Sequence, residues 1–146
     1  MPWLILFAVL SLDQLSKFIV LERLSYLKSI PVILNVFHLT LVKNYGIAFG
    51  LFPGFGPVFI AVAIIFVLLV FRQLWSHKEM LRGREVLGLY LVLGGALGNL
   101  VDRLRFGYVV DFLDFRVWPV FNVADTCISV GAGLIVWQLI GSYATK

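Results

Sequence analysis

Residues 94–125 read GGALGNLVDRLRFGYVVDFLDFRVWPVFNVAD, and this stretch determines how the rest of the chain is organised. It begins inside one apolar, helix-like run and ends at the start of another. Between the two runs it carries a dense set of polar side chains, namely Asn99, Asp102, Arg103, Asp111, Asp114, Arg116, Asn122 and Asp125. In an apolar chain a polar group is costly unless it has a partner or a function. We therefore expect the functional site to lie in this stretch.

The composition of the whole chain is typical of an integral membrane protein. Of its 146 residues, 61% are hydrophobic and only 14% are charged, and the mean hydropathy is +0.99. The basic residues are scattered instead of following one face, so the net charge of +4 does not predict a nucleic-acid partner. The single cysteine, Cys127, excludes an internal disulfide, and Cys127, His38 and His77 do not form a zinc-binding spacing. We expect no metal and no cofactor, although carboxylates alone could hold magnesium.

The apolar stretches predict four transmembrane helices, since each approaches the length that crosses a bilayer. They cover residues 1–21, 57–75, 86–101 and 122–143 of a single membrane-embedded domain, 1–146. No basic residue precedes the first stretch and no small-residue cleavage site follows it, so we interpret it as a retained helix and not a signal peptide. Between the first two helices, residues 25–56 include a segment rich in Val, Ile, Phe and Thr, which predicts a small β-rich element at the membrane surface.

The loop between the second and third helices predicts the orientation. It has the densest basic residues outside the apolar runs: Arg72, Lys78, Arg82 and Arg84. The positive-inside rule places such a loop in the cytoplasm, and four spans then put both termini on that side. The β-rich element and nearly all the carboxylates fall on the exoplasmic side, where they form one polar cluster.

Two charged residues interrupt the first span. Asp13 and Lys17 are four residues apart with the acid first, which puts them on one helix face in the favourable order. One interpretation is a self-neutralising pair near the outer helix end. The other is a pair that faces the bundle and supports the site.

Paired aspartates are the best supply of an acid and a base in this cluster. Nucleophilic catalysis would need a base beside Cys127 or Ser129, and neither histidine is placed to serve. Two carboxyls held close together share one proton, because both cannot ionise cheaply.

The candidate aspartates differ in their sequence setting. Asp111 lies among apolar residues that would raise its pKa, and Asp125 opens a helix. Asp102 is followed by Arg103, which favours an ionised carboxylate in a structural ion pair, and we expect Asp114 to face water. The residues favour the pair Asp111 and Asp125, with Asp102 and Asp125 as the second possibility.

Five short motifs give the chain a resemblance to a known family. In order they are Asp13-Gln14-Leu15-Ser16-Lys17, Asn44-Tyr45-Gly46-Ile47-Ala48-Phe49, Gly98-Asn99-Leu100-Val101-Asp102-Arg103, Val109-Val110-Asp111-Phe112 and Phe121-Asn122-Val123-Ala124-Asp125. Over its whole length the chain resembles lipoprotein signal peptidases (signal peptidase II), which are aspartyl peptidases of the bacterial cytoplasmic membrane.

The resemblance implies a role for each motif. Asp111 and Asp125 correspond to the catalytic aspartates, and Asn44, Asn99, Arg103 and Asn122 to substrate-binding residues. Asp13, Lys17, Gly46 and Asp102 correspond to structural support.

The implied activity is cleavage of bacterial prolipoproteins just before a cysteine that carries diacylglycerol. The chain would work as a monomer in contact with membrane lipid, with its active site at the exoplasmic face. The alternative is a small proton-coupled transporter or relay, because ionisable residues inside a membrane also mark ion paths.

Overall fold

The computed structural model describes residues 3–46, 56–76, 81 and 83–144. In these residues the chain forms four long helices and one sheet. The helices are α1 (Trp3–Arg23), α2 (Gly56–Ser76), α3 (Gly83–Phe106) and α4 (Val123–Ala144). All four are long and apolar enough to cross a membrane, which confirms the predicted fold class.

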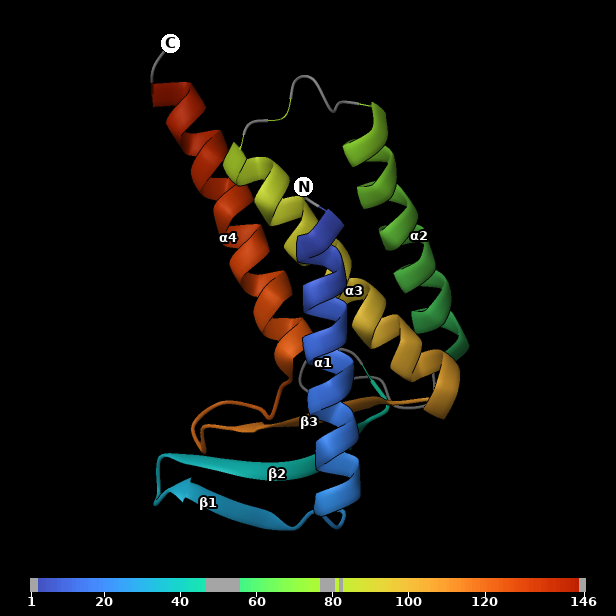
Figure 1. Ribbon diagram of the computed structural model, residues 1–146, viewed down its shortest axis with the longest axis vertical. Coiled ribbons are helices and arrows are strands. Elements are labelled where there is room, and N and C mark those ends of the chain that lie inside the picture. The colour runs from blue at the N-terminus through green and yellow to red at the C-terminus, as the bar shows by residue number, and fades with distance from the viewer. Residues whose placement is uncertain (1–2, 47–55, 77–80, 82, 145–146) are drawn as a thin grey trace.

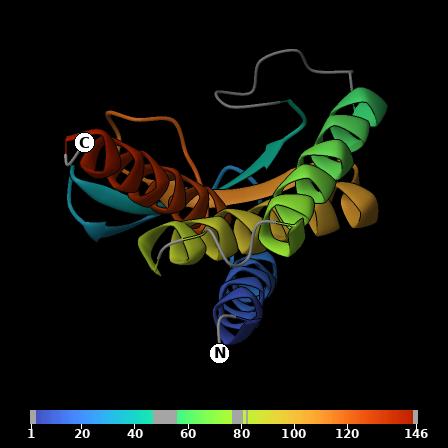
Figure 2. The same ribbon diagram turned by 90° about the horizontal axis from the view of Figure 1, so that it is seen from above.

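The third helix is central to the bundle. It contacts α1, α2 and α4, and it is the most buried of the four. Seen from above, α3 crosses between α1 on one side and α2 and α4 on the other (Figure 2). It also continues to Phe106, beyond the predicted end at residue 101, so Asp102 and Arg103 are helical residues and not loop residues.

Small residues let α3 approach its neighbours closely. A Cβ added to Gly88 would come within 2.6 Å of the carbonyl oxygen of Gly131 on α4. A Cβ on Gly98 would collide with the carboxylate of Asp13 on α1. Lipid tails are as apolar as the helix side chains, so the hydrophobic effect does not drive helices together inside a membrane. Close backbone contact of this kind is therefore a main source of helix association there.

A three-stranded antiparallel sheet lies at one end of the bundle (Figure 1). Its strands are β1 (Ser29–Ile33), β2 (Phe37–Asn44) and β3 (Val109–Asp114), in the order β1-β2-β3. The first two come from the predicted β-rich connection. The third comes from the α3–α4 connection, where the sequence had not predicted a strand. The N-terminal end of α1 and the C-terminal end of α4 point away from the sheet (Figure 1).

The alternation of β3 separates a core face from a site face. Val110 and Phe112 are buried against Val20 of α1, Leu24 just after that helix, and Leu41 of β2. Because successive strand side chains point to opposite faces, Asp111 points the other way, and the register brings Asn44 of β2 diagonally beside it. The apolar face of this strand therefore fixes the direction of one acid.

Candidate active site

Asp111 and Asp125 come from different elements and meet through one residue, Asn122. The Nδ2 of Asn122 donates to Asp111 Oδ1 at 2.7 Å, and its backbone N–H donates to Asp125 Oδ2 at 3.3 Å. Asn122 is completely buried, so it joins the two acids on their protein-facing side. The resemblance implied a substrate-binding role for Asn122. Its position is instead that of a residue that holds both carboxyls.

Asn122 also begins α4, and this explains why Asp125 is where it is. Its Oδ1 accepts the backbone N–H of Asp125 at 2.9 Å, while Asp125 accepts the backbone N–H of Asn122. This reciprocal arrangement is a capping box, in which the N-cap residue and the residue three positions later satisfy each other's free N–H groups. Helix α4 therefore presents one acid as part of its own start.

Two further asparagines complete the hydrogen bonding of the acids. Asn44 Nδ2 donates to Asp111 Oδ2 at 2.9 Å, and Asn99 Nδ2 donates to Asp125 Oδ1 at 2.8 Å. Each carboxylate oxygen of the pair thus accepts from an amide, and among the described residues no lysine or arginine forms an ion pair with either acid. Neutral donors orient both carboxyls, and they favour the ionised form less strongly than the positive charge of an ion-pair partner would.

Asp111 is held in conditions that favour its protonated form. Burial raises the pKa of Asp111 to about 7, and the negative charge of Asp125 adds to the rise. The hydrogen bonds from Asn44 and Asn122 oppose this effect and only partly offset it. Near neutral pH, Asp111 can therefore exist in both protonation states, which suits a group that exchanges protons.

A cavity of about 270 Å³ opens beside the two acids. The polar part of its wall consists of Asn44, Asn99, Arg103, Asp111, Asp125 and Ser129. Apolar side chains of the β3–α4 connection and of α4, including Trp118, Phe121 and Ile128, close the rest. The structure therefore brings five of the predicted site residues to one hollow, with both acids on its surface.

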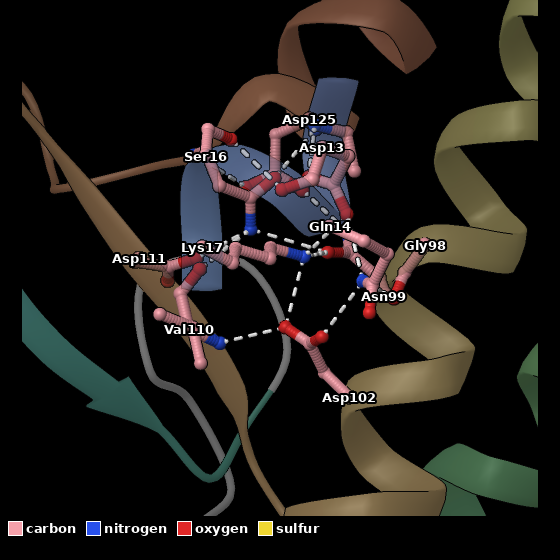
Figure 3. Close-up of polar contacts among 12 residues, drawn as sticks. Asp13, Gln14, Ser16, Lys17, Gly98, Asn99, Asp102, Val110, Asp111 and Asp125 are labelled. Atoms are coloured by element: carbon pink, nitrogen blue, oxygen red, sulfur yellow. Dashed lines mark hydrogen bonds and ion pairs between the residues drawn. The ribbon is translucent and has the colours of Figure 1, made fainter. Parts of the chain in front are cut away.

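Lys17 forms the centre of a second, fully buried cluster (Figure 3). Its Nζ lies 2.9 Å from Asp13 Oδ2 and 2.8 Å from Asp102 Oδ2. The pair in α1 therefore faces the bundle, as the second interpretation of the sequence had it. Gln14 was missed by the sequence reasoning, although it adjoins Asp13 in an apolar span. Its Nε2 donates to Asp13, Asp102 and the carbonyl oxygen of Gly98.

The predicted ion pair between Asp102 and Arg103 is wrong. Adjacent helix residues point in different directions, so Asp102 turns to Lys17 and the backbone N–H of Val110. Arg103 instead donates to the carbonyl oxygens of Asn99 and Gly46. Asp102 is only 1% exposed and does not line the cavity, which leaves Asp111 and Asp125 as the favoured pair.

The expectation that Asp114 faces water is also wrong. Asp114 is buried on β3, where it accepts from the Thr40 hydroxyl at 2.7 Å and from Arg116 through both backbone and side chain. Thr40 lies on the neighbouring strand, which the sequence could not pair with residue 114. Asp114 thus holds the start of the β3–α4 connection to the sheet.

The second sequence motif and the possibility of a metal site can be assessed only within the described residues. Residues 47–49 of the second motif lie outside the described residues, so only Asn44, Tyr45 and Gly46 of that motif are placed. Within the described part of the chain, no group of three or more His, Cys, Asp or Glu side chains could hold a metal ion.

The chain is similar to proteins of known kind over nearly its full length. Residues 5–141 match the family model described as Signal peptidase (SPase) II. Over 141 residues the chain is 46% identical to the lipoprotein signal peptidase of Halothermothrix orenii, covering 94% of this chain and 96% of that protein. Over 144 residues it is 50% identical to the lipoprotein signal peptidase of Moorella thermoacetica, covering 96% of this chain and 93% of that protein. A solved bacterial membrane enzyme, obtained by the in meso method at 2.3 Å resolution, has a TM-score of 0.91 at 29% identity and covers 99% of this chain and 90% of its own.

Proposed function

The chain belongs to the signal peptidase II family, and we propose that it is an aspartic endopeptidase in which Asp111 and Asp125 act as one pair. The observation that carries the proposal is the bridge through Asn122, which holds the two carboxyls beside one cavity with neutral amide donors. The relatives from Halothermothrix orenii and Moorella thermoacetica are lipoprotein signal peptidases and not transporters. Strand β3 and the start of α4, which carry the two acids, lie together at one end of the bundle and do not form a chain across it (Figure 1).

In the proposed mechanism, the ionised member of the pair takes a proton from water, and the resulting hydroxide attacks the scissile carbonyl carbon. The protonated member donates its proton to the carbonyl oxygen as charge develops there. The tetrahedral intermediate then collapses: its hydroxyl returns a proton to a carboxylate, and the leaving nitrogen takes a proton from the other acid. Two carboxyls with one shared proton are thereby restored. The pair titrates as a unit, so either acid can start as the base.

The proposed substrate is a bacterial prolipoprotein whose cysteine carries diacylglycerol, cut just before that cysteine. Beside Asp125 a second hollow of about 560 Å³ is lined mainly by Phe115, Val117, Trp118, Phe121 and Val130. This apolar surface suits lipid chains or an apolar peptide segment, while the peptide bond enters the polar cavity. Asn44, Asn99 and Arg103 line that cavity and are the proposed contacts to the substrate backbone.

We also propose the orientation and state of the chain. Residues 1–146 form one domain that works as a monomer in the bacterial cytoplasmic membrane, in contact with lipid and without nucleic acid. Both termini and the α2–α3 connection are cytoplasmic. The sheet and the acid pair then lie at the exoplasmic face.

The proposal is tested by turnover of a diacylglyceryl-modified precursor by the full chain purified in detergent, read by mass spectrometry. Asn has nearly the shape of Asp but cannot exchange the proton, so Asp111→Asn and Asp125→Asn should each abolish cleavage. Because the acids act as one unit, the double variant should be scarcely worse than either single one.

Asp114→Asn is the matched control, since it replaces another buried aspartate on the same strand outside the cavity. It should keep its turnover at temperatures below its own unfolding midpoint. Wild-type turnover by either Asp111→Asn or Asp125→Asn would refute the pair.

A further inference from the structure

Lys17 is buried with all three of its ammonium hydrogens committed. It is 2% exposed, and its Nζ contacts one oxygen of each of three side chains: Asp13, Asp102 and Asn99. The first two contacts neutralise charge. The third, at 3.0 Å to Asn99 Oδ1, neutralises nothing, because the partner is an uncharged amide. In Figure 3 the ammonium lies between Asp102 and Asn99.

This third contact decides which way the Asn99 amide points. An ammonium group can only donate hydrogen bonds, so the atom of Asn99 that faces Lys17 must be its oxygen. The NH₂ group is then directed at Asp125 Oδ1, 2.8 Å away. We propose that Lys17 is a positioning residue for the catalytic pair, which it controls by fixing the orientation of the Asn99 amide; this inference rests on the proposed function of that pair.

The orientation of Asn99 is passed on to the second acid. Asn99 Oδ1 also accepts from Asn122 Nδ2 at 3.1 Å, and the same NH₂ group donates to Asp111 at 2.7 Å. A reversed Asn99 amide would set its NH₂ against the Lys17 ammonium and the Asn122 NH₂, and its oxygen against the Asp125 carboxylate. The orientation that Lys17 imposes on Asn99 is thus the one in which both acids face donors, and the Asn122 amide is held in addition by the Asp125 N–H on its Oδ1.

The same cluster has a structural role that an experiment must separate. Asp13 accepts the backbone N–H of Ala124 at 2.9 Å, and Asp102 accepts that of Val110 at 3.0 Å. Each of these residues directly precedes one acid of the pair. Removing Lys17 alone would leave two buried carboxylates without a counter-charge, which is strongly destabilising. Loss of activity in such a variant would not reveal which role was lost.

The double variant Asp13→Asn/Lys17→Met separates the two roles. In the wild type, two carboxylates and one ammonium leave one formal negative charge, and in the double variant Asp102 alone leaves the same charge. We expect Lys17→Met to lower the unfolding midpoint and the double variant to recover most of it. In the recovered protein kcat should still fall, on the order of tenfold to a hundredfold for one lost hydrogen bond to a charged group, with little change in KM. Recovery of kcat together with stability would overturn the inference.

A cycle through Asn99 tests whether Lys17 acts by that route. In an Asn99→Leu background, the Asp13→Asn/Lys17→Met changes should lower kcat no further, because the amide they orient is absent. Multiplying losses would contradict the inference. The matched control is Gln14→Met, which removes hydrogen bonds to Asp13 and Asp102 from the same cluster without touching Asn99. It should lower the unfolding midpoint and leave kcat near the wild-type value.

A measurement that needs no turnover keeps the inference distinct from the proposed function. In protein labelled with ¹⁵N-asparagine, the side-chain NH₂ signal of Asn99 is identified by its loss in Asn99→Leu. Its hydrogens should be protected from solvent exchange in the wild type and in Gln14→Met, and should exchange faster in Asp13→Asn/Lys17→Met. Unchanged protection in the double variant would overturn the role of Lys17. A wild type that shows this pattern but cleaves no precursor would refute the proposed function alone.

Discussion

At the scale of single residues, β3 carries two aspartates whose environments act in opposite directions. Burial raises the pKa of Asp111 to about 7, with a further contribution from the charge of Asp125. Burial acts the same way on Asp114, but hydrogen bonds from Thr40 and Arg116 outweigh it and lower the pKa of that carboxyl. Three positions along one strand therefore separate an acid that can keep its proton near neutrality from one that stays ionised.

The raised pKa of Asp111 predicts how stability depends on pH. An aspartate in an unfolded chain has a pKa of about 4, so between about pH 4 and pH 7 the folded chain binds a proton that the unfolded chain has lost. This contribution to stability is complete below the unfolded value and is lost as the pH rises through 7. Asp111→Asn keeps the neutral state at every pH. Between pH 5 and pH 8 its unfolding midpoint should therefore fall less than that of the wild type.

The measurement is thermal unfolding in one detergent across this pH range, with Asp114→Asn as the comparison. Because the folded pKa of Asp114 is lowered, its contribution is present above the unfolded pKa and is lost only as the solution becomes more acidic. Removing it should leave the slope between pH 5 and pH 8 unchanged. Equal slopes for the wild type and Asp111→Asn would show that Asp111 is already ionised at pH 5.

At the scale of elements, the approach of α1 to α3 depends on a missing side chain. The carboxylate of Asp13 occupies the place that a Cβ of Gly98 would fill. That carboxylate also accepts from Lys17, Gln14 and the backbone N–H of Ala124 at the start of α4. The glycine in α3 therefore permits the ion cluster that ties α1, α3 and α4 together.

Gly98→Ala should push Asp13 away from Lys17 and loosen the helix start that carries Asp125. We expect a loss of about 1–3 kcal/mol of unfolding free energy, as for other overpacked sites, together with reduced turnover. The control is Gly133→Ala on α4, where an added Cβ meets nothing within 4 Å. That change should leave turnover intact and should raise the unfolding free energy by at most about 1 kcal/mol, because alanine has a higher helix propensity than glycine. Equal unfolding midpoints for the two variants would show that α1 can retreat from α3 without cost.

At the scale of the whole molecule, each of the four described helices runs between the sheet end of the bundle and the opposite end (Figure 1). Arg72 lies near the end of α2 and Arg84 near the start of α3, both at the end away from the sheet. The acid pair and its cavity lie where the bundle meets the sheet. A membrane that surrounds the apolar helices would leave this site near one surface, where water and a lipid-anchored substrate can both reach it.

The positive-inside rule predicts that the sheet end is exoplasmic. A reporter fused after Lys146 should then give a cytoplasmic signal, and a reporter inserted near Lys28, between α1 and β1, should give an exoplasmic one. Paired reporters that are active on opposite sides of the membrane make this measurement. The reverse pattern would put the site on the cytoplasmic face and contradict the proposed access of the substrate.

Local properties of the sequence determined much of this protein. Hydropathy over about 20 residues predicted the four helices, because crossing a bilayer requires an uninterrupted apolar length. The apolar run from residue 122 placed Asp125 at the opening of the fourth helix, and the spacing of Asp13 and Lys17 put them on one helix face. The apolar surroundings of Asp111 indicated a carboxyl that would be hard to ionise. Each of these inferences depends only on neighbours along the chain.

Only the tertiary structure decided which polar groups became partners. Pairing of β3 with β2 buried Asp114 and brought Asn44 to Asp111, and no local pattern specifies that register. The packing of α3 against α1 directs Asp102 toward Lys17, with which it forms an ion pair, and not toward the adjacent Arg103. Hydrogen bonds and ion pairs act over about 3 Å, so their partners are fixed only when elements distant in sequence have packed. The sequence thus determined which residues were costly to bury, and the packing of α1, α3, α4 and β3 determined how each was satisfied.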